Sequence, residues 1–166
     1  GTLTLFSGDI GIEQIVIGTG TSATAVTTGT AALNVNAAAL LTPVMITGNA
    51  GNNILTATSG NDTLNGGAGN DLLKGGEGSD IYLISSATDH SLAEIEDNGL
   101  TGIDEIRFGA SVSSTLTIFA GNIGVERIVI GTGVASNAII SGTAALHVNA
   151  SNAANALTIM GNTGNN

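Results

Sequence analysis

The stretch that decides the fold runs from Gly48 to Leu83 and divides into four consecutive blocks of nine residues. The blocks read GNAGNNILT, ATSGNDTLN, GGAGNDLLK and GGEGSDIYL, and they begin at Gly48, Ala57, Gly66 and Gly75. Each block opens with small residues, carries Asn or Asp at its sixth position and has a large apolar residue at its eighth. A short repeat of this regularity is typical of a parallel β-solenoid, in which every block adds one turn and one short strand.

The strand at the end of each block predicts where the core lies. Successive side chains of a strand point to opposite faces, so the eighth residue faces inward and its neighbours face outward. The residues assigned to the interior are Leu55, Leu64, Leu73 and Tyr82. The glycines supply the backbone angles that a sharp turn requires. We therefore expect an all-β fold, a right-handed parallel β-solenoid, with two blocks per coil and alternate blocks stacked about 4.8 Å apart.

This stacking places acidic turn residues over one another. Asn53 is expected below Asp71 on one edge of the coil, and Asp62 below Asp80 on the other. Stacked carboxylates repel unless a hard cation lies between them, and Ca²⁺ accepts six to eight oxygens in flexible geometry, whereas Mg²⁺ prefers a tight octahedron. The alternative is a solenoid in which the turn Asp and Asn side chains bond only their own backbone. Four blocks in register favour calcium.

The four blocks resemble the RTX family, the calcium-binding repeat proteins that bacteria secrete through type I systems. The resemblance implies a calcium β-roll whose sites combine turn carbonyls with the sixth side chains of two turns one coil apart. One implied site consists of Asn49, Gly51 and Asn53 with Gly66, Ala68 and Asp71. A second consists of Thr58, Gly60 and Asp62 with Gly75, Glu77 and Asp80.

Family arrays also close with a pair of aspartates downstream of the last block, and this chain has a similar pair. The implied third site consists of Gly76, Gly78, Asp80, Asp97 and Asp104. No onward partner for Asp71 is evident from the sequence. The resemblance covers residues 48–108 and extends to the tail 161–166.

Composition limits the possible partners. The 166 residues contain no cysteine, three Lys and Arg, and thirteen Asp and Glu, for a net charge of -10. Nucleic-acid binding needs clustered basic residues, so the sequence argues against it. No apolar run approaches the roughly 20 residues of a membrane span, and no signal peptide is evident. Beginning and ending in mid-pattern, the sequence reads as a piece of a longer protein.

An internal repeat organises the rest of the chain. Residues 3–53 align without a gap on residues 116–166, a shift of 113 positions, and about half of the aligned residues are identical. We therefore divide the chain into a solenoid flank at 1–47, the β-roll at 48–83, closing strands at 84–115 and a second unit starting at 116–166. Neighbouring repeat units of the same chain are the expected protein partners.

The flanks predict further short strands. Alternating apolar residues indicate strands at 3–6, 12–17, 33–35, 44–46, 93–95 and 105–108. Residues 19–30 have the composition of a linker, and residues 37–41 are long enough for only a single helical turn. His90, near Glu94, is expected to make a structural hydrogen bond, and Glu13 and Glu126 are expected to be surface residues.

These features predict a structural function with calcium as the cofactor. We expect a segment of an extracellular or cell-surface protein, such as an adhesin or surface-layer protein, that folds on calcium after export. No nucleophile lies near a base, so the chain is not expected to be an enzyme. Two alternatives remain: the export region of a secreted hydrolase or toxin, and an ice- or ligand-binding solenoid with Thr-rich faces. The surface or matrix partner is not specified by the sequence.

Overall fold

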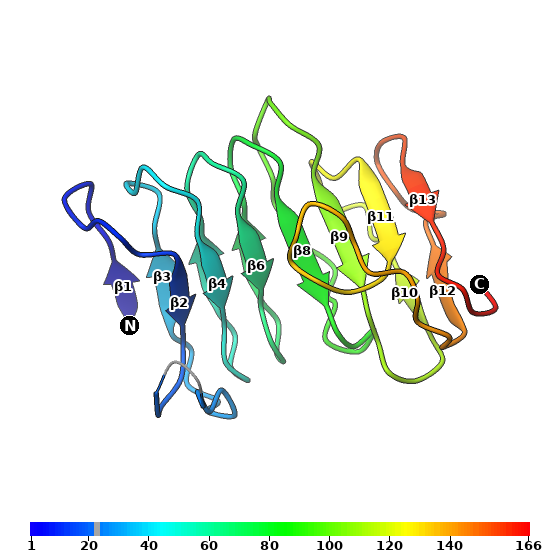
Figure 1. The fold of residues 1–166 in the computed structure, drawn as a ribbon, viewed down its shortest axis with the longest axis horizontal. Coiled ribbons are helices and arrows are strands. Elements are labelled where there is room, and N and C mark those ends of the chain that lie inside the picture. The colour runs from blue at the N-terminus through cyan, green and yellow to red at the C-terminus, as the bar shows by residue number, and fades with distance from the viewer. Residues whose placement is uncertain (22–23) are drawn as a thin grey trace.

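The chain winds into a solenoid of stacked coils, drawn in Figure 1 with the N-terminus at one end and the C-terminus near the other. A computed structural model describes residues 1–21 and 24–166. Over these residues the chain forms thirteen short strands and no helix. Every pairing between the named strands is parallel. The predicted all-β parallel solenoid is therefore confirmed.

Two long sheets form the opposite faces of the solenoid. The four-stranded sheet contains β1 (Thr2–Thr4), β3 (Asn34–Asn36), β5 (Ile54–Thr56) and β7 (Leu72–Lys74). The seven-stranded sheet contains, in spatial order, β13 (Thr158–Met160), β11 (Arg127–Ile130), β9 (Glu105–Phe108), β8 (Ile81–Ile84), β6 (Thr63–Asn65), β4 (Met45–Thr47) and β2 (Gln14–Val16). The strands β10 (Ser114–Thr117) and β12 (Leu146–Asn149) form a separate pair.

The core is a stack of aliphatic side chains enclosed between these sheets. Leu55 pairs with Leu73, and Leu64 pairs with Tyr82, so each residue pairs with the equivalent position two blocks later in the chain. All four side chains are fully buried, as predicted. Burial of a side chain of this size contributes about 1.5–3 kcal/mol. The nonapeptide repeat thus produces one buried residue per half coil.

The structure differs from the predicted strands in three places. The segment at 93–95 makes only an isolated bridge, between Ile95 and Leu73. The strands predicted at 3–6 and 12–17 are shorter, since turns take over where their alternation meets glycine. Residues 37–41 form one turn, closed by a 2.9 Å hydrogen bond from the Leu40 N–H to the Ala37 carbonyl, in agreement with the prediction that the segment is long enough for a single turn only. The segment is too short to nucleate a helix.

The segment predicted as a linker at 19–30 is a loop with its own pairing. Thr19 and Val26 form an antiparallel bridge, and their counterparts Thr132 and Ile139 do the same. Two residues of this segment, Ser22 and Ala23, lie outside the described residues. The threonines described here belong to a loop, so they do not form the flat strand face expected of an ice-binding solenoid.

The internal repeat is visible in the fold. Strands β10, β11, β12 and β13 occupy the positions that align with β1, β2, β3 and β4 in the sequence repeat, and they repeat the same pairing. The registers are equivalent: Leu3 pairs with Val35, and Leu116 pairs with Val148. The division of the chain at residues 47, 83 and 115 stays a prediction.

Candidate calcium sites

Along one edge of the solenoid, acidic side chains form a column that we call the carboxylate column: Asp62, Asp80, Asp104 and Glu126. Each member ends the turn before β6, β8, β9 or β11. The backbone N–H of each member donates to the carboxylate of the next, at 2.7 Å from Asp62 to Asp80, 2.8 Å from Asp80 to Asp104 and 2.9 Å from Asp104 to Glu126. The predicted position of Asp62 below Asp80 is therefore observed. The column connects successive coils through one carboxylate per turn.

Two members of this column, Asp80 and Asp104, converge with a third carboxylate from outside it, that of Asp97. One ligand atom from each of Asp80, Asp97 and Asp104 lies within 4.8 Å of the other two, and all three residues are buried. Asp97 begins the turn that precedes β9, and the Tyr82 hydroxyl donates a hydrogen bond to it. The same hydroxyl accepts a 3.0 Å hydrogen bond from the Gly75 N–H. The structure thus brings together the three side chains of the predicted third site.

The raised pKa values of these carboxylates show that their negative charges are unfavourable when no cation is bound. Burial, together with the neighbouring charges of Asp62, Asp97 and Asp104, raises the pKa of Asp80 from 3.8 to about 8. Burial, with Asp97 and Glu126 nearby, raises the pKa of Asp104 to about 7. Burial also raises the pKa of Asp62, although three hydrogen-bond contributions oppose the shift. Removing charges from water in this way is unfavourable unless an opposite charge is present.

The opposite edge holds the other predicted pair. The Asn53 N–H donates to Asp71 Oδ1 at 2.8 Å, so Asn53 lies below Asp71 as predicted. Both hydrogens of the Asn53 amide are used: Nδ2 donates to the Leu33 carbonyl at 2.6 Å and to Asn49 Oδ1 at 3.0 Å, while Oδ1 accepts from the Asn49 N–H at 2.9 Å. Burial, followed by the charge of Glu94, raises the pKa of Asp71 to about 6.

Turn carbonyls lie close to the turns of the following coil. A Cβ at Gly67 would lie 2.5 Å from the Asn49 carbonyl oxygen, and one at Gly69 would lie 2.9 Å from that of Gly51. On the other edge, a Cβ at Gly76 would lie 2.6 Å from the Thr58 carbonyl oxygen. Because these glycines have positive φ and no Cβ, the turns approach closely enough to share ligands.

The remaining predicted carbonyl ligands lie in the same stacked turns. Those of the first two sites are Gly60, Gly66, Ala68, Gly75 and Glu77, and Gly76 and Gly78 belong to the third. Gly66 and Gly75 lie against the carboxylates of Asp71 and Asp80 in their own turns. The Glu77 side chain instead accepts hydrogen bonds from the next turn, from the Thr101 hydroxyl and the Leu100 N–H. Only the backbone of Glu77 is therefore available to a site.

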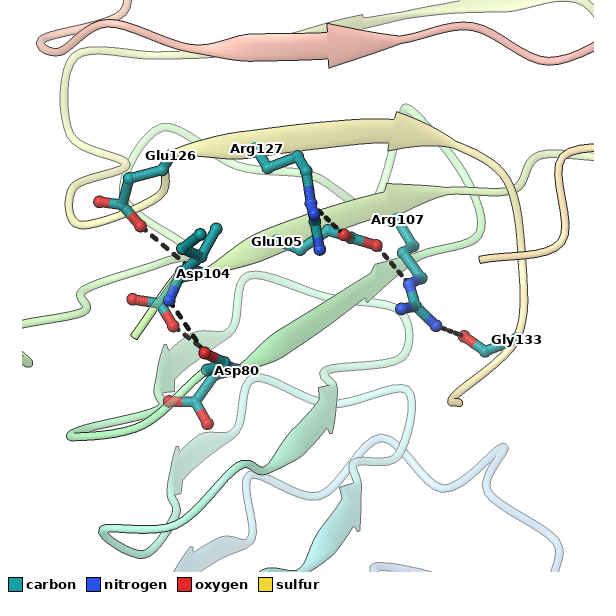
Figure 2. Close-up of polar contacts among 9 residues, drawn as sticks. Asp80, Asp104, Glu105, Arg107, Glu126, Arg127 and Gly133 are labelled. Atoms are coloured by element: carbon teal, nitrogen blue, oxygen red, sulfur yellow. Dashed lines mark hydrogen bonds and ion pairs between the residues drawn. The ribbon is translucent and has the colours of Figure 1, made fainter. Parts of the chain in front are cut away.

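Two features of this region were not evident from the sequence. Glu126, predicted to be a surface residue, is exposed but also accepts the N–H of Asp104. Beside it, Glu105 forms ion pairs with Arg107 and Arg127, and the Arg107 guanidinium donates to the Gly133 carbonyl at 2.8 Å; Figure 2 shows this network next to Asp80 and Asp104. The sequence repeat indicated that Glu126 is significant, because Glu126 aligns with Glu13. The repeat gave no indication of the ion pairs, since Glu105 lies outside both aligned segments.

The histidines hold structural positions. The Nδ1 atom of buried His90 contacts the Glu94 carboxylate, as predicted, and the imidazole lies 5.9 Å from the Phe119 ring. His147 is exposed on β12.

The donor set fits calcium. Buried Oδ2 atoms of Asp71 and Asp80 have no hydrogen-bond partner. In the turn of Asp80 the carbonyl oxygens of Gly76 and Gly78 lie against Gly99 and Gly102 of the following coil, so the groups near this carboxylate include further oxygen donors. Hard cations prefer such a set, and Ca²⁺ tolerates its irregular geometry. A bound cation would compensate the buried charges of these turns.

Comparison with known proteins agrees with this chemistry. The family model of the RTX calcium-binding nonapeptide repeat matches residues 47–82 in four copies, one residue earlier than the blocks read from the sequence. No curated protein and no solved structure matches the chain. Among the described residues, no helix is long and apolar enough to cross a membrane. The segment at 47–82 is therefore similar to the RTX calcium-binding nonapeptide repeat, and Ca²⁺ is the ion that this repeat binds.

Proposed function

We propose that this chain is a non-enzymatic, load-transmitting segment of a secreted or cell-surface bacterial protein, of the adhesin or surface-layer kind, and that it becomes rigid when it binds calcium outside the cell. The observation that carries the proposal is the convergence of three buried carboxylates, those of Asp80, Asp97 and Asp104. Burial raises the pKa of two of them, Asp80 and Asp104. Such a cluster destabilises the metal-free fold and stabilises the calcium-bound one.

The energetics follow from mass action. An ion that binds the folded chain but not the unfolded chain adds about 2.7 kcal/mol to the free energy of unfolding when its concentration is 100 times its Kd. Extracellular calcium modules have Kd values of about 10⁻⁴–10⁻³ M. At millimolar calcium, about 1–10 times these Kd values, each site adds about 0.4–1.4 kcal/mol. Two or three sites then contribute about 1–4 kcal/mol, a substantial part of the total stability of a domain of about 5–15 kcal/mol.

This dependence supports folding after export. Where calcium is scarce, the chain carries a net charge of -10 and repels itself, which favours an extended state that passes through a type I exporter. Where calcium is at millimolar concentration, the turns close and the strands between them stack. The thin aliphatic core then extends through both repeat units, and the chain acts as a stiff rod.

Circular dichroism with and without a chelator tests the proposal. The β-sheet signal and the cooperative thermal transition are expected in millimolar CaCl₂ at pH 7.5 and are expected to be lost or shifted far down in EGTA. Readdition of CaCl₂ should restore them, whereas MgCl₂ at the same concentration should not. A transition that is unchanged after exhaustive EGTA treatment would contradict the proposed coupling.

A matched pair of variants distinguishes calcium from general acidity. Asp97→Asn removes a charge from the buried cluster, and Asp9→Asn removes a charge from an exposed turn outside the column and outside the predicted sites. The counterpart of Asp9 is Asn122, which accepts the equivalent backbone N–H, so asparagine keeps this hydrogen bond. Both substitutions change the net charge by the same amount. Only Asp97→Asn is expected to raise the calcium concentration at the folding midpoint.

A further inference from the structure

The end of the solenoid formed by β1, β2 and the turn at residues 5–13 is apolar and uncovered, and we call this surface the uncovered face. Leu3 is 53% exposed, Phe6 65% and Ile10 86%. β2 is the end strand of the seven-stranded sheet, so one edge of its backbone has no strand beside it among the described residues, whereas its counterpart β11 pairs with β9 on that edge. An uncovered edge of this kind is a site where another strand pairs.

The second repeat unit shows the same face in a covered state. Leu116, the counterpart of Leu3, is 0% exposed, and Ile123, the counterpart of Ile10, falls to 37%. The covering element is the closing coil of the first unit: β11 pairs with β9, and Ile123 forms a bridge with Glu96. The chain thus contains one covered and one uncovered version of the same surface.

Polar contacts at the covered junction have matching groups on the uncovered face. At the junction, Glu126 accepts the Asp104 N–H and the Gly133 carbonyl accepts from Arg107 (Figure 2). The counterparts of these two acceptors are Glu13 and Gly20, with residue types unchanged. Gln14 replaces Arg127 beside the position of Glu105, and its amide still offers a donor to that carboxylate.

We infer that the uncovered face is a docking surface for the closing coil, residues 84–113, of another copy of the repeat unit placed ahead of it in the same polypeptide. The pairing of β11 with β9 gives the register: residues 14–17 lie beside residues 105–108 of that copy. A second molecule of this chain has no free closing coil to offer, because its own residues 116–133 cover it. Tandem placement leaves the closing coil of the added unit free to dock.

Thiol labelling tests the inference, since the chain has no cysteine of its own. Leu3→Cys is made in the full chain and in a tandem protein with a second copy of residues 1–113 fused ahead of Gly1, where only the downstream Leu3 is changed. In millimolar CaCl₂ we expect the thiol to react with Ellman's reagent at least about tenfold more slowly in the tandem protein, because a covered side chain reacts only when the junction opens.

Two controls make the outcome decisive. Leu116→Cys in the full chain gives the rate for a covered position, and the downstream Leu100→Cys, at an exposed turn, should react rapidly in both proteins. Circular dichroism confirms that each protein is folded. Equal labelling rates of Leu3→Cys in the two folded proteins overturn the inference. Slow labelling in the full chain that becomes faster on dilution also overturns it, because the dependence on concentration means that a second molecule occupies the face.

Discussion

Asp80 is predicted to serve two calcium sites at once, and this makes Asp80→Asn the most informative substitution. Asp80 accepts the Asp62 N–H from the preceding coil, and it lies in the cluster with Asp97 and Asp104 of the following coil. Asparagine keeps the volume and the acceptor oxygen for the Asp62 N–H. It removes the negative charge that both sites share.

The expected magnitude follows from the number of sites affected. At a calcium concentration 100 times Kd, each site adds about 2.7 kcal/mol to the free energy of unfolding. Asp80→Asn should therefore remove up to about 5 kcal/mol of calcium-dependent stability, since two sites lose a charged ligand. Asp97→Asn, which affects one site, should remove about half as much.

In the absence of calcium the effect has the opposite sign. The pKa of Asp80 is raised to about 8, so at pH 9 the folded chain holds an unfavourable buried charge there. Asparagine cannot ionise, and the metal-free variant should be at least as stable as the unchanged protein at pH 9. A calcium-independent structural role for the carboxylate predicts a loss of stability instead.

The assay is urea denaturation followed by circular dichroism, in CaCl₂ and in EGTA, together with calorimetric titration of the number of bound ions. The expected result is a loss of two ions for Asp80→Asn and one for Asp97→Asn. Equal losses from the two variants would show that Asp80 is not shared. A loss of stability in EGTA as large as that in CaCl₂ would show that its role is packing and not coordination.

Three further predictions concern pH, packing and the turns. The pKa values of Asp71, Asp104 and Asp80 in the folded metal-free chain are about 6, 7 and 8, above the ordinary value of 3.8, so the folded state binds more protons. In EGTA, the melting temperature should therefore be highest near pH 4 and decrease as pH rises through 6–8. Calorimetry should show calcium affinity rising over the same pH range. A melting temperature that does not change with pH would contradict this. Leu73→Ala should cost about 2–5 kcal/mol in urea denaturation, against less than about 1 kcal/mol for Ile54→Ala on the outer surface of the neighbouring strand, and similar costs would refute the assignment of the core. Gly67→Ala and Gly11→Ala both place alanine at positive φ, which costs about 1–2 kcal/mol of stability. Only at Gly67 does the new Cβ also lie 2.5 Å from the Asn49 carbonyl oxygen, so the melting temperature should fall further for Gly67→Ala. An equal fall for the two variants would refute the proposed close approach.

The period of nine made much of the fold predictable. Because side chains alternate along a strand, the eighth position of each block identified the buried Leu55, Leu64, Leu73 and Tyr82. The same period placed Asn53 below Asp71 and Asp62 below Asp80, and the hydrogen bonds between these residues confirm it. The prediction worked because every coil in this region has the same length, two nonapeptides.

Outside the nonapeptides the coils vary in length, and prediction from the sequence was weaker there. Tyr82 pairs with Ile106 across a turn that is longer than those of the nonapeptides, and the register across it has no repeat to define it. The strand expected at 93–95 reduced to a bridge for the same reason. Asp97 and Asp104 were nevertheless assigned to the third site, on the resemblance to a family and not on periodicity.

The sequence by itself determined the solenoid, the direction of its side chains, the long internal repeat and the choice of calcium, since each depends on spacing along the chain or on the type of ligand atom. Only the tertiary structure revealed the burial of the Asp80 cluster, the hydrogen bonds of the Asn53 amide and the ion pairs of Glu105 with Arg107 and Arg127. These features depend on how loops of unequal length bring distant residues together. Spacing along the sequence does not predict such contacts, because the length of a loop does not determine the path that the loop follows.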